Sequence, residues 1–483
     1  MKNYQKILCL LLTICMLTAL YSCSGEVQEP VSEVTETTVE TAAETSYFES
    51  FEKKDYEGYK FRILSYDIFE NFAEDSENGD IVNDTLYRRD NTIAELLNIE
   101  FVKQEESNGN VNDIIKKCVT AGEDAYDLVY TSFDSGVSLL ASSVLADLNA
   151  MPNLNFDGEH WSALLNESLS FNGKQYFASG DILPTFFYVP NSVVYNMDKL
   201  AEYGFDSTPY EDVKNGSWTY DAFYNYIINT ERDLDGDGKI TIENDFVPFA
   251  YTNIALEGFY VSGGNYFTKK DPDKGISVDV IDDRTTSAIE KLKNIFSDSN
   301  ICLPGQGNDQ GTNMIIQRQF FGECRGLFAA CSLDTICLSG RGMEDDYMII
   351  PCPKYDESQP TYYSMINPYV NYAVMIPRTI SDPDRTGIVV EMLAAYGHEY
   401  LRPAVYDNMM KNKIARNEES IEMLEIIYST AISDLGVLNR FKSNSNAIQN
   451  YLTGNVNSYI SQIEASKNAT EADIEEFMEA FAD

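Results

Sequence analysis

Between residues 59 and 148, segments with the hydrophobic spacing of a strand alternate with segments that have the hydrophobic spacing of a helix. Segments 59–66, 98–104 and 127–132 alternate or are short and apolar, which predicts strands. Segments 82–97, 111–121 and the stretch through Leu145 carry apolar residues at helical spacing. A strand–helix order repeated three times predicts a mostly parallel sheet with right-handed crossovers. The expected fold class is therefore α/β.

The pattern changes beyond residue 170. Segment 173–196 is extended but contains Pro184 and Pro190, which favours a ribbon connecting two parts of the fold over a central strand. Short apolar runs predict further strands at 326–331 and 347–351. Helical spacing recurs in six later segments, namely 220–230, 285–297, 313–321, 387–397, 418–433 and 446–482.

The N-terminus carries an export signal. Lys2 and Lys6 precede an apolar run at 7–20, too short to span a bilayer comfortably, so residues 1–22 read as a secretory signal peptide. The run ends in Leu-Tyr-Ser-Cys23, which resembles the bacterial lipoprotein signal and implies that Cys23 is lipidated. Ordinary secretion with an accidental cysteine is the alternative. Residues 23–55, rich in Ser, Thr, Val and Glu, are expected to form a disordered tether.

Length, composition and net charge limit the classes of function that this chain could have. The 483 residues exceed one usual domain, and 44% are hydrophobic, which is enough for a large core. The net charge of −42 repels phosphate and anionic lipid, so nucleic acid is excluded as a partner. His160 and His398 are the only histidines, which excludes a His-rich metal site. The 32 tyrosines favour a surface binder of neutral polar ligands over an intracellular enzyme.

Six cysteines remain after Cys9, Cys15 and Cys23. They permit disulfides in an exported chain, although a chain of this length does not need them. No CxxC spacing occurs, so a zinc ribbon is not expected. The six are Cys118, Cys302, Cys324, Cys331, Cys337 and Cys352.

One acidic loop resembles an EF-hand calcium loop. Alternating carboxylates converge, a glycine follows at the sharp turn, and hard oxygen ligands suit Ca²⁺. The bidentate glutamate that should close the loop is replaced by Asn244, so we expect a structural ion of modest affinity, or else a solvated acidic turn. The expected ligands are Asp233, Asp235, Asp237, the Lys239 carbonyl, Asn244 and Asp245.

Four segments together resemble a known family. Their order along the chain is similar to that in extracellular solute-binding proteins of bacterial ABC importers, in the group that mostly takes sugars. The segments are 127–134 (DLVYTSFD), 194–200 (VYNMDKL), 216–223 (GSWTYDAF) and 320–330 (FFGECRGLFAA).

The resemblance implies a type 2 periplasmic-binding-protein-like fold of two lobes joined by a hinge. Lobe one would be 56–185 with 370–400, and lobe two 186–365 with 401–483. The hinge would include 181–188 and a strand near 363–369. The resemblance also implies permease transmembrane subunits as partners, a monomer, and a place on the extracellular face of a cell membrane, in a Gram-positive organism.

Candidate ligand contacts follow from two arguments. Tyr66, Phe133 and Asp134 lie at the carboxyl ends of predicted strands, where ligands of such sheets bind. The resemblance and the expected crossovers add the others. For each, core packing or turn chemistry is an equal alternative, and for Asp134 the alternative is a helix N-cap. The remaining candidates are Tyr188, Tyr260, Asn265, Asp334, Asn367, Tyr369 and Tyr372.

The leading hypothesis is a lipid-anchored binding subunit of an importer that captures a carbohydrate, expected to be an oligosaccharide, by hinge closure and without chemistry. An extracellular glycan hydrolase remains open, because carboxylates are plentiful. A glycan-capture lipoprotein that works without a transporter also remains open.

Overall fold

The computed structural model describes residues 46–67, 72–73, 75–230, 233–238, 244–271, 275–304, 315–412, 414–415, 417–438, 441–479 and 481. The folded unit is Ser46–Asp483. The expected signal peptide, Cys23 and most of the expected tether lie outside the described residues.

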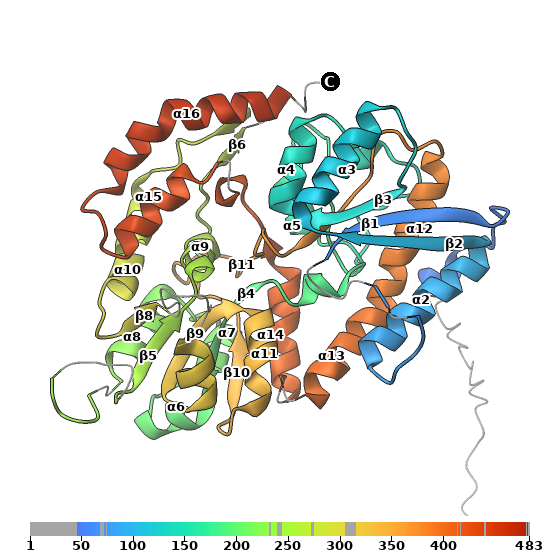
Figure 1. Cartoon of the computed structure of the whole chain (residues 1–483). Helices are drawn as coiled ribbons and strands as arrows, with labels where there is room; N and C mark the ends of the chain where they lie inside the picture. Colours follow the sequence, from blue (N-terminus) through green and yellow to red (C-terminus); the bar gives the residue numbers. More distant parts are fainter. Residues whose placement is uncertain are drawn as a thin grey trace, which may run out of the picture. The chain divides into compact units, whose positions relative to one another are not determined.

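The first sheet has four strands in the order β12-β3-β1-β2 (Figure 1). β1 pairs in parallel with β2 and β3, while β12 pairs antiparallel with β3. The strands are β1 Tyr59–Tyr66, β2 Ile99–Glu106, β3 Leu128–Ser132 and β12 Tyr372–Met375. The helices along these segments are α2 Ile81–Leu97, α3 Asn108–Thr120, α4 Phe133–Ala141, α5 Ala163–Leu169 and α12 Pro383–Tyr396.

Local chemistry explains where these helices begin and end. The Asp80 carboxylate accepts hydrogen bonds from the backbone N–H groups of Val82 and Asn83, which caps α2. Asn98 closes α2 in the left-handed region at φ 47°, a conformation that asparagine tolerates. The chain then turns directly into β2, so the parallel crossover is short.

The second sheet has five strands in the order β10-β4-β9-β5-β8. β4 runs antiparallel to both neighbours, and the other pairs are parallel. The strands are β4 Asn191–Asn196, β5 Val247–Tyr251, β8 Cys302–Pro304, β9 Gly326–Ser332 and β10 Tyr347–Ile350. The associated helices are α6 Met197–Tyr203, α7 Pro209–Asn215, α8 Tyr220–Ile228, α9 Asn253–Ser262, α10 Asp283–Phe296 and α11 Leu333–Ser339.

The remaining elements connect or cover the sheets. Helices and strands of the later chain are β6 Lys269–Asp271, β7 Gly275–Ser277, β11 Ser364–Met365, α13 Arg402–Lys411, α14 Glu418–Ser429, β13 Ala431–Ile432, α15 Ser443–Leu452 and α16 Tyr459–Glu479. Short 3-10 or π turns are η2 Phe48–Ser50, η3 Leu148–Ala150, η4 Pro184–Phe187, η5 Ile315–Gly322, η6 Gly340–Gly342, η7 Gly397–Leu401 and η8 Leu435–Val437.

Three extended segments lie side by side between the two sheets. β11 pairs in parallel with β13, and Pro190 forms an antiparallel bridge with Ile366. The Asn367 N–H donates to the Val189 carbonyl at 3.2 Å. Two of these segments fall in or beside the ranges expected for the hinge.

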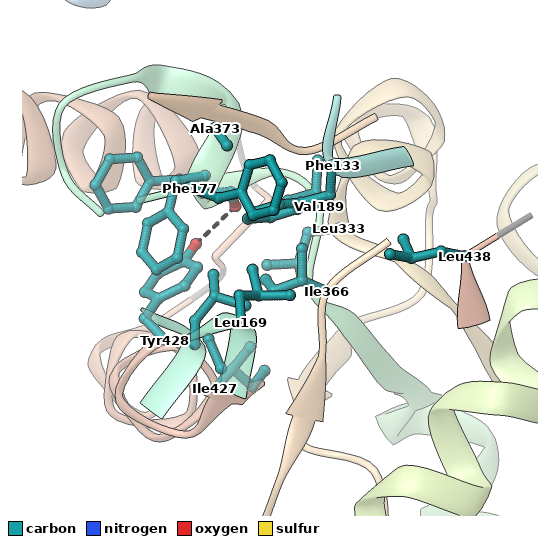
Figure 2. Packing of buried hydrophobic residues seen from close by; sticks show 14 of the residues in the cluster. Phe133, Leu169, Phe177, Val189, Leu333, Ile366, Ala373, Ile427, Tyr428 and Leu438 are labelled. Carbon is teal, nitrogen blue, oxygen red and sulfur yellow. Dashed lines mark hydrogen bonds between the residues drawn. The ribbon is translucent and has the colours of Figure 1, made fainter. Parts of the chain in front are cut away.

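A continuous apolar core fills the junction between the sheets (Figure 2). Phe133 and Phe177 come from the four-stranded half, and Leu333 comes from the five-stranded half. Tyr428 on α14 is buried there, and its hydroxyl donates to the Phe187 carbonyl at 3.0 Å. The halves are therefore joined by packing as well as by backbone.

The structure differs from the expected elements in five places. The end of segment 173–196 is not a connecting ribbon: residues 191–196 form β4, an internal strand, because Pro184 lies in η4 and Pro190 stands before the strand, so neither proline interrupts its pairing. Segment 418–433 is helical only as far as Ser429, and 431–432 form β13. Segment 315–322 is a π-helix, and the long C-terminal helix is split into α15 and α16 by a turn around Gly454. Part of the expected tether is packed: Phe48 is buried, and its N–H donates to the Glu399 Oε1 at 2.7 Å. The aromatic residues of this stretch supply an apolar surface that the Ser/Thr-rich residues before it lack.

Two further findings concern the described residues. No helix among them has both the length and the apolar character needed to cross a bilayer. The six cysteines are free thiols, namely Cys118, Cys302, Cys324, Cys331, Cys337 and Cys352.

Candidate functional site

A cavity of about 430 Å³ lies at the carboxyl-terminal edge of the five-stranded sheet. Ser332 ends β9, Thr252 follows β5, and Asn367 follows β11, so the cavity lies where parallel strands end. Its walls come from α9, α11, α15 and the segment leading to β12. The lining residues are Thr252, Asn253, Ile254, Glu257, Ser332, Asp334, Thr335, Asn367, Tyr369, Val370, Lys442, Asn446 and Gln449.

Tyr369 is a fixed aromatic wall of this cavity. Its hydroxyl donates to the Val437 carbonyl at 2.8 Å, and the Lys442 ammonium lies 5.6 Å from the ring centre. Burial raises the pKa of Tyr369, and the negative charges of Glu257 and Asp134 raise it further. The ring therefore offers an apolar surface whose orientation is set by a hydrogen bond.

Glu257 is a buried carboxyl group in the cavity wall. It is 4% exposed, and its Oε1 accepts hydrogen bonds from the Ser445 hydroxyl and, at 2.7 Å, from the Gln449 side-chain amide. Burial raises the pKa of Glu257 to about 7, and these hydrogen bonds together with the charge of Lys442 only partly offset it. Glu257 thus ties α9 to α15 beside the cavity.

Asp334 occupies the first turn of α11, where negative charge interacts well with the helix dipole. Its Oδ1 accepts from the Ser332 hydroxyl and from the Thr335 N–H, the latter at 2.7 Å. Asn367 is similarly held: its Oδ1 accepts from the Tyr369 N–H at 3.1 Å. The two side chains are preorganised acceptors for hydroxyl groups of a ligand.

Asp134 approaches the same place from the four-stranded half. Its N–H donates to the Pro368 carbonyl at 3.3 Å, and its charge acts on the Tyr369 hydroxyl. The alternative assignment of Asp134 as a helix cap is wrong, because Ser132 caps α4 by accepting from the Ser135 N–H.

The other candidate ligand contacts lie outside this cavity. Phe133 and Tyr260 are buried in the core, and the Tyr260 ring stacks on Phe267 at 4.4 Å. Asn265 is buried; its amide donates to the Tyr260 carbonyl at 3.0 Å and its Oδ1 accepts from Arg284. Their structural roles explain their burial.

Three tyrosines remain from the expected set. Tyr66 and Tyr372 contact each other at 5.6 Å between ring centres at the edge of the four-stranded sheet. Tyr188, which follows η4, is partly buried; its carbonyl accepts from the Asp334 N–H at 2.7 Å. Tyr188 therefore positions the backbone of a cavity residue without lining the cavity.

Sequence reasoning missed eight polar cavity residues, namely Thr252, Asn253, Glu257, Ser332, Thr335, Lys442, Asn446 and Gln449. Only Glu257 carried a signal, because it is the single charged residue in the largely apolar helix at 253–262. Buried carboxylates are rare and need partners, which makes such a residue a site candidate.

A second cavity, of about 460 Å³, lies beside β13. Its walls come from α5 on one side and from Tyr266–Lys270 and Tyr363 on the other. No strand of either large sheet ends in it, so strand-end geometry favours the first cavity as the ligand site.

The acidic loop brings its three aspartates together. Ligand oxygens of Asp233, Asp235 and Asp237 lie within 4.8 Å of one another. The Asp233 carboxylate accepts from the N–H groups of Gly236 and Gly238 at 2.7 and 2.8 Å, which folds the loop around it. This donor set of hard oxygens fits Ca²⁺.

The rest of the expected calcium set is only partly in place. Asn244 donates to Asp235 at 3.1 Å, and the Asp245 carboxylate accepts from the Leu234 N–H at 2.9 Å. Lys239 lies outside the described residues, so its expected carbonyl ligand stays a prediction.

No family model and no curated protein matches this chain. Among solved structures, the cyclic α-maltosyl-1,6-maltose binding protein of Arthrobacter globiformis has a TM-score of 0.57 at 14% identity, covering 86% of this chain and 99% of that protein. UspC of M. tuberculosis has a TM-score of 0.56 at 12% identity, covering 86% and 100%.

The GacH receptor of Streptomyces glaucescens is also similar, with a TM-score of 0.52 at 13% identity over 86% of this chain and 99% of that protein. These likenesses establish the fold. The chain has the α/β, two-lobed, periplasmic-binding-protein-like fold of sugar-type ABC solute-binding proteins, which confirms the predicted fold class and, at the level of fold, the predicted resemblance.

Proposed function

We propose that this protein is the solute-binding subunit of an ABC importer and that it captures a carbohydrate in the cavity at the strand ends. The supporting observation is the cavity itself: one fixed aromatic wall, Tyr369, beside preorganised acceptors, Asp334 and Asn367, is suited to a sugar's C–H face and hydroxyl groups. Hinge closure would exclude water from it. No reaction is required.

The structural neighbours support a sugar. One is a binding protein for cyclic α-maltosyl-1,6-maltose, and another is a receptor solved in complex with acarbose. We infer that this chain's ligand is also an oligosaccharide. We further propose residues 56–185 with 370–400 as lobe one and 186–365 with 401–483 as lobe two, with Asp134 presented to the cavity from lobe one.

A calorimetric glycan panel tests the proposal. The protein should bind at least one neutral oligosaccharide at one site per chain, and Asp334→Asn should weaken that binding about tenfold or more, because a charged acceptor is lost. Asp283→Asn is the matched control, since Asp283 is also an acid in the first turn of a helix, α10, but lies outside the cavity. Absence of binding across the panel would contradict the proposal.

A hydrolase is the second candidate, favoured by one observation: the cavity holds two carboxyl groups, Glu257 and Asp334, and burial raises the pKa of Glu257 to about 7, which suits a general acid. Chromatography of each glycan after prolonged incubation separates the two functions. Recovery of unchanged glycan would support the function of a binding protein. Shorter products would show instead that the protein is a hydrolase.

We propose that the chain is exported and anchored through a lipid on Cys23, working as a monomer with permease subunits. The support is the signal sequence described above. In cells, Cys23→Ala should move the protein from the membrane fraction to the medium. Retention of the variant in the membrane would contradict lipid anchoring.

We also propose a structural Ca²⁺ in the acidic loop, held by Asp233, Asp235 and Asp237, with Lys239, Asn244 and Asp245 completing the set. The support is the convergence of three carboxylates within 4.8 Å. Calcium should raise the melting temperature of the protein relative to chelator, and Asp235→Asn should remove most of that rise. An equal rise in the variant would contradict the site.

A further inference from the structure

The two halves also meet beside β13, where α5 faces β6 and the end of α16. On one side is α5, which belongs to the four-stranded half: Asn166 exchanges hydrogen bonds with the Ser179 backbone, and the adjoining Ala178 bridges to Val374 of β12. On the other side are β6, the residues after β13 and the end of α16, which itself contacts α4 (Figure 1).

β6 and its approach belong to the five-stranded half. The Phe267 N–H donates to the Asp434 carboxylate at 2.7 Å, and the Asn444 side chain on α15 donates to the Phe267 carbonyl at 3.2 Å. α15 in turn packs on α10 and α16. A contact from β6 to α5 therefore joins the two halves.

Lys270 on β6 makes that contact. Its ammonium group donates to the Glu167 carbonyl at 2.8 Å and to the Ser170 carbonyl at 2.7 Å. Both carbonyls lie at the C-terminal end of α5, so one amino group joins β6 to the end of that helix. The Ser433 N–H, after β13, adds a bond to the Ser168 hydroxyl at 3.2 Å.

An aromatic contact lies on the same side. Phe481, beyond the end of α16, is 2% exposed and meets Phe171 and Tyr176 edge-to-face at 5.9 and 5.2 Å between ring centres. Phe477 of α16 supports it at 5.3 Å. Phe171 and Tyr176 follow α5, so this contact also joins the halves.

We propose that Lys270 and Phe481 form a clasp that holds the two lobes closed and thereby sets how strongly the strand-end cavity retains its ligand. The proposal rests on the proposed function, because only a protein that works by lobe closure is regulated in this way. Closing the clasp orders α5 against β6 without any ligand, so it shifts the population toward the closed state.

The charge of Lys270 makes the clasp sensitive to pH. Part of the side chain remains exposed, yet removal of water around the ammonium group lowers the pKa of Lys270 to about 8, while the carboxylates of Asp434 and Glu167 oppose this. The neighbouring Lys269 instead extends to Asp282 at 3.3 Å. In the open state Lys270 faces water and returns to its ordinary range.

The direction of the pH effect on closure follows from the different pKa of Lys270 in the closed and open states. Between pH 8 and the ordinary lysine range, the closed state has released a proton that the open state still holds. Raising the pH therefore favours closure, by up to about tenfold in the closing equilibrium for each pH unit in that window. The neutral amine keeps two N–H donors for the two carbonyls.

Spin labels on ketone-bearing non-natural residues at Lys117 of α3 and Asn294 of α10, both exposed, measure the closure without altering the native thiols. In the whole chain without ligand, the label-to-label distance should shorten between pH 7 and pH 9.5. Lys270→Met should abolish this shift, and the matched control Lys269→Met should retain it. Phe481→Ala should lengthen the distance at both pH values.

A Lys270→Met variant that keeps the wild-type shift, or a folded Phe481→Ala variant with an unchanged distance, would overturn the clasp. Circular dichroism establishes that each variant is folded. The measurement contains no glycan, so its outcome is separate from the glycan panel: a protein that clasps but binds no glycan contradicts the proposed function and leaves the clasp in place.

Discussion

Glu257 shows how one residue can link structure, stability and a candidate site. It is the one charged residue of the largely apolar helix α9, lines the cavity and accepts hydrogen bonds only from α15 in the described contacts. Burial opposes its ionised form, so its charge is held at a free-energy cost near neutral pH.

Replacing this carboxyl group should therefore alter the pH dependence of stability. The pKa of Glu257 is raised from 4.5 to about 7 in the folded protein, so the folded state keeps a proton that the unfolded state loses. The free energy of unfolding should fall as the pH rises through this window, by roughly 2–3 kcal/mol in total. Glu257→Gln should flatten this fall in urea titrations from pH 4.5 to 8.

Glu290→Gln is the matched control, because Glu290 is an exposed glutamate that accepts one hydrogen bond, from the Tyr451 hydroxyl at 2.7 Å. Its variant should keep the wild-type pH profile. If Glu257→Gln also kept that profile, the raised pKa of Glu257 would be contradicted.

At the scale of elements, Asp181 fixes the first connecting segment to the helices of the late chain. Its carboxylate is 1% exposed and accepts from Arg402 on α13 at 2.9 Å through two nitrogens and from His398 on η7 at 2.7 Å. Gly397 permits this approach, since a Cβ there would lie 2.0 Å from the Asp181 carbonyl oxygen. The contact spans more than 200 residues of sequence.

Removing Arg402 should leave the Asp181 carboxylate buried without its bidentate partner. Arg402→Met should lower the free energy of unfolding by about 3–5 kcal/mol. Arg88→Met is the control, because the Arg88–Glu77 pair is exposed and such pairs contribute less than about 1 kcal/mol. Chemical denaturation measures the free energy of unfolding of both variants. Equal small decreases in the two variants would show that the contacts of Asp181 with Arg402 contribute little stability.

Elements with a clear period were predictable from sequence. The alternation in 59–66 predicts β1 with the bounds observed, because one face of that strand is more buried than the other. β5 was missed: its five residues are all buried, so no alternation marks it, and it follows a loop whose acidic residues dominate the local pattern.

The site was predictable only where it follows strands. Asp334 and Asn367 come directly after extended segments, so strand-end reasoning finds them. Glu257 and Lys442 lie 185 positions apart and meet only because α15 folds onto α9. No local spacing encodes that contact. Tyr260 and Asn265 were expected at the ligand on resemblance, yet their side chains are needed inside the core.

At the scale of the whole molecule, the net charge of −42 favours expansion through repulsion between like charges. Salt screens that repulsion, with a Debye length near 10 Å at about 0.1 M. The melting temperature should therefore rise as sodium chloride is increased from 0.01 to about 0.3 M. A melting temperature that falls over this range in calorimetry would show that attractive ion pairs outweigh the repulsion.

The antiparallel pairing of β3 with β12 has a consequence for how the chain acquires its structure. Residues 129–132 of β3 can pair with β12 only after residues 372–375 have been synthesised. The first sheet therefore lacks its outer strand until late in synthesis. Until then β3 has a bare edge open to pairing with another chain. Contacts so remote in sequence form slowly, so a polypeptide released before residue 372 should aggregate, and refolding should pass through a long-lived intermediate with that edge exposed.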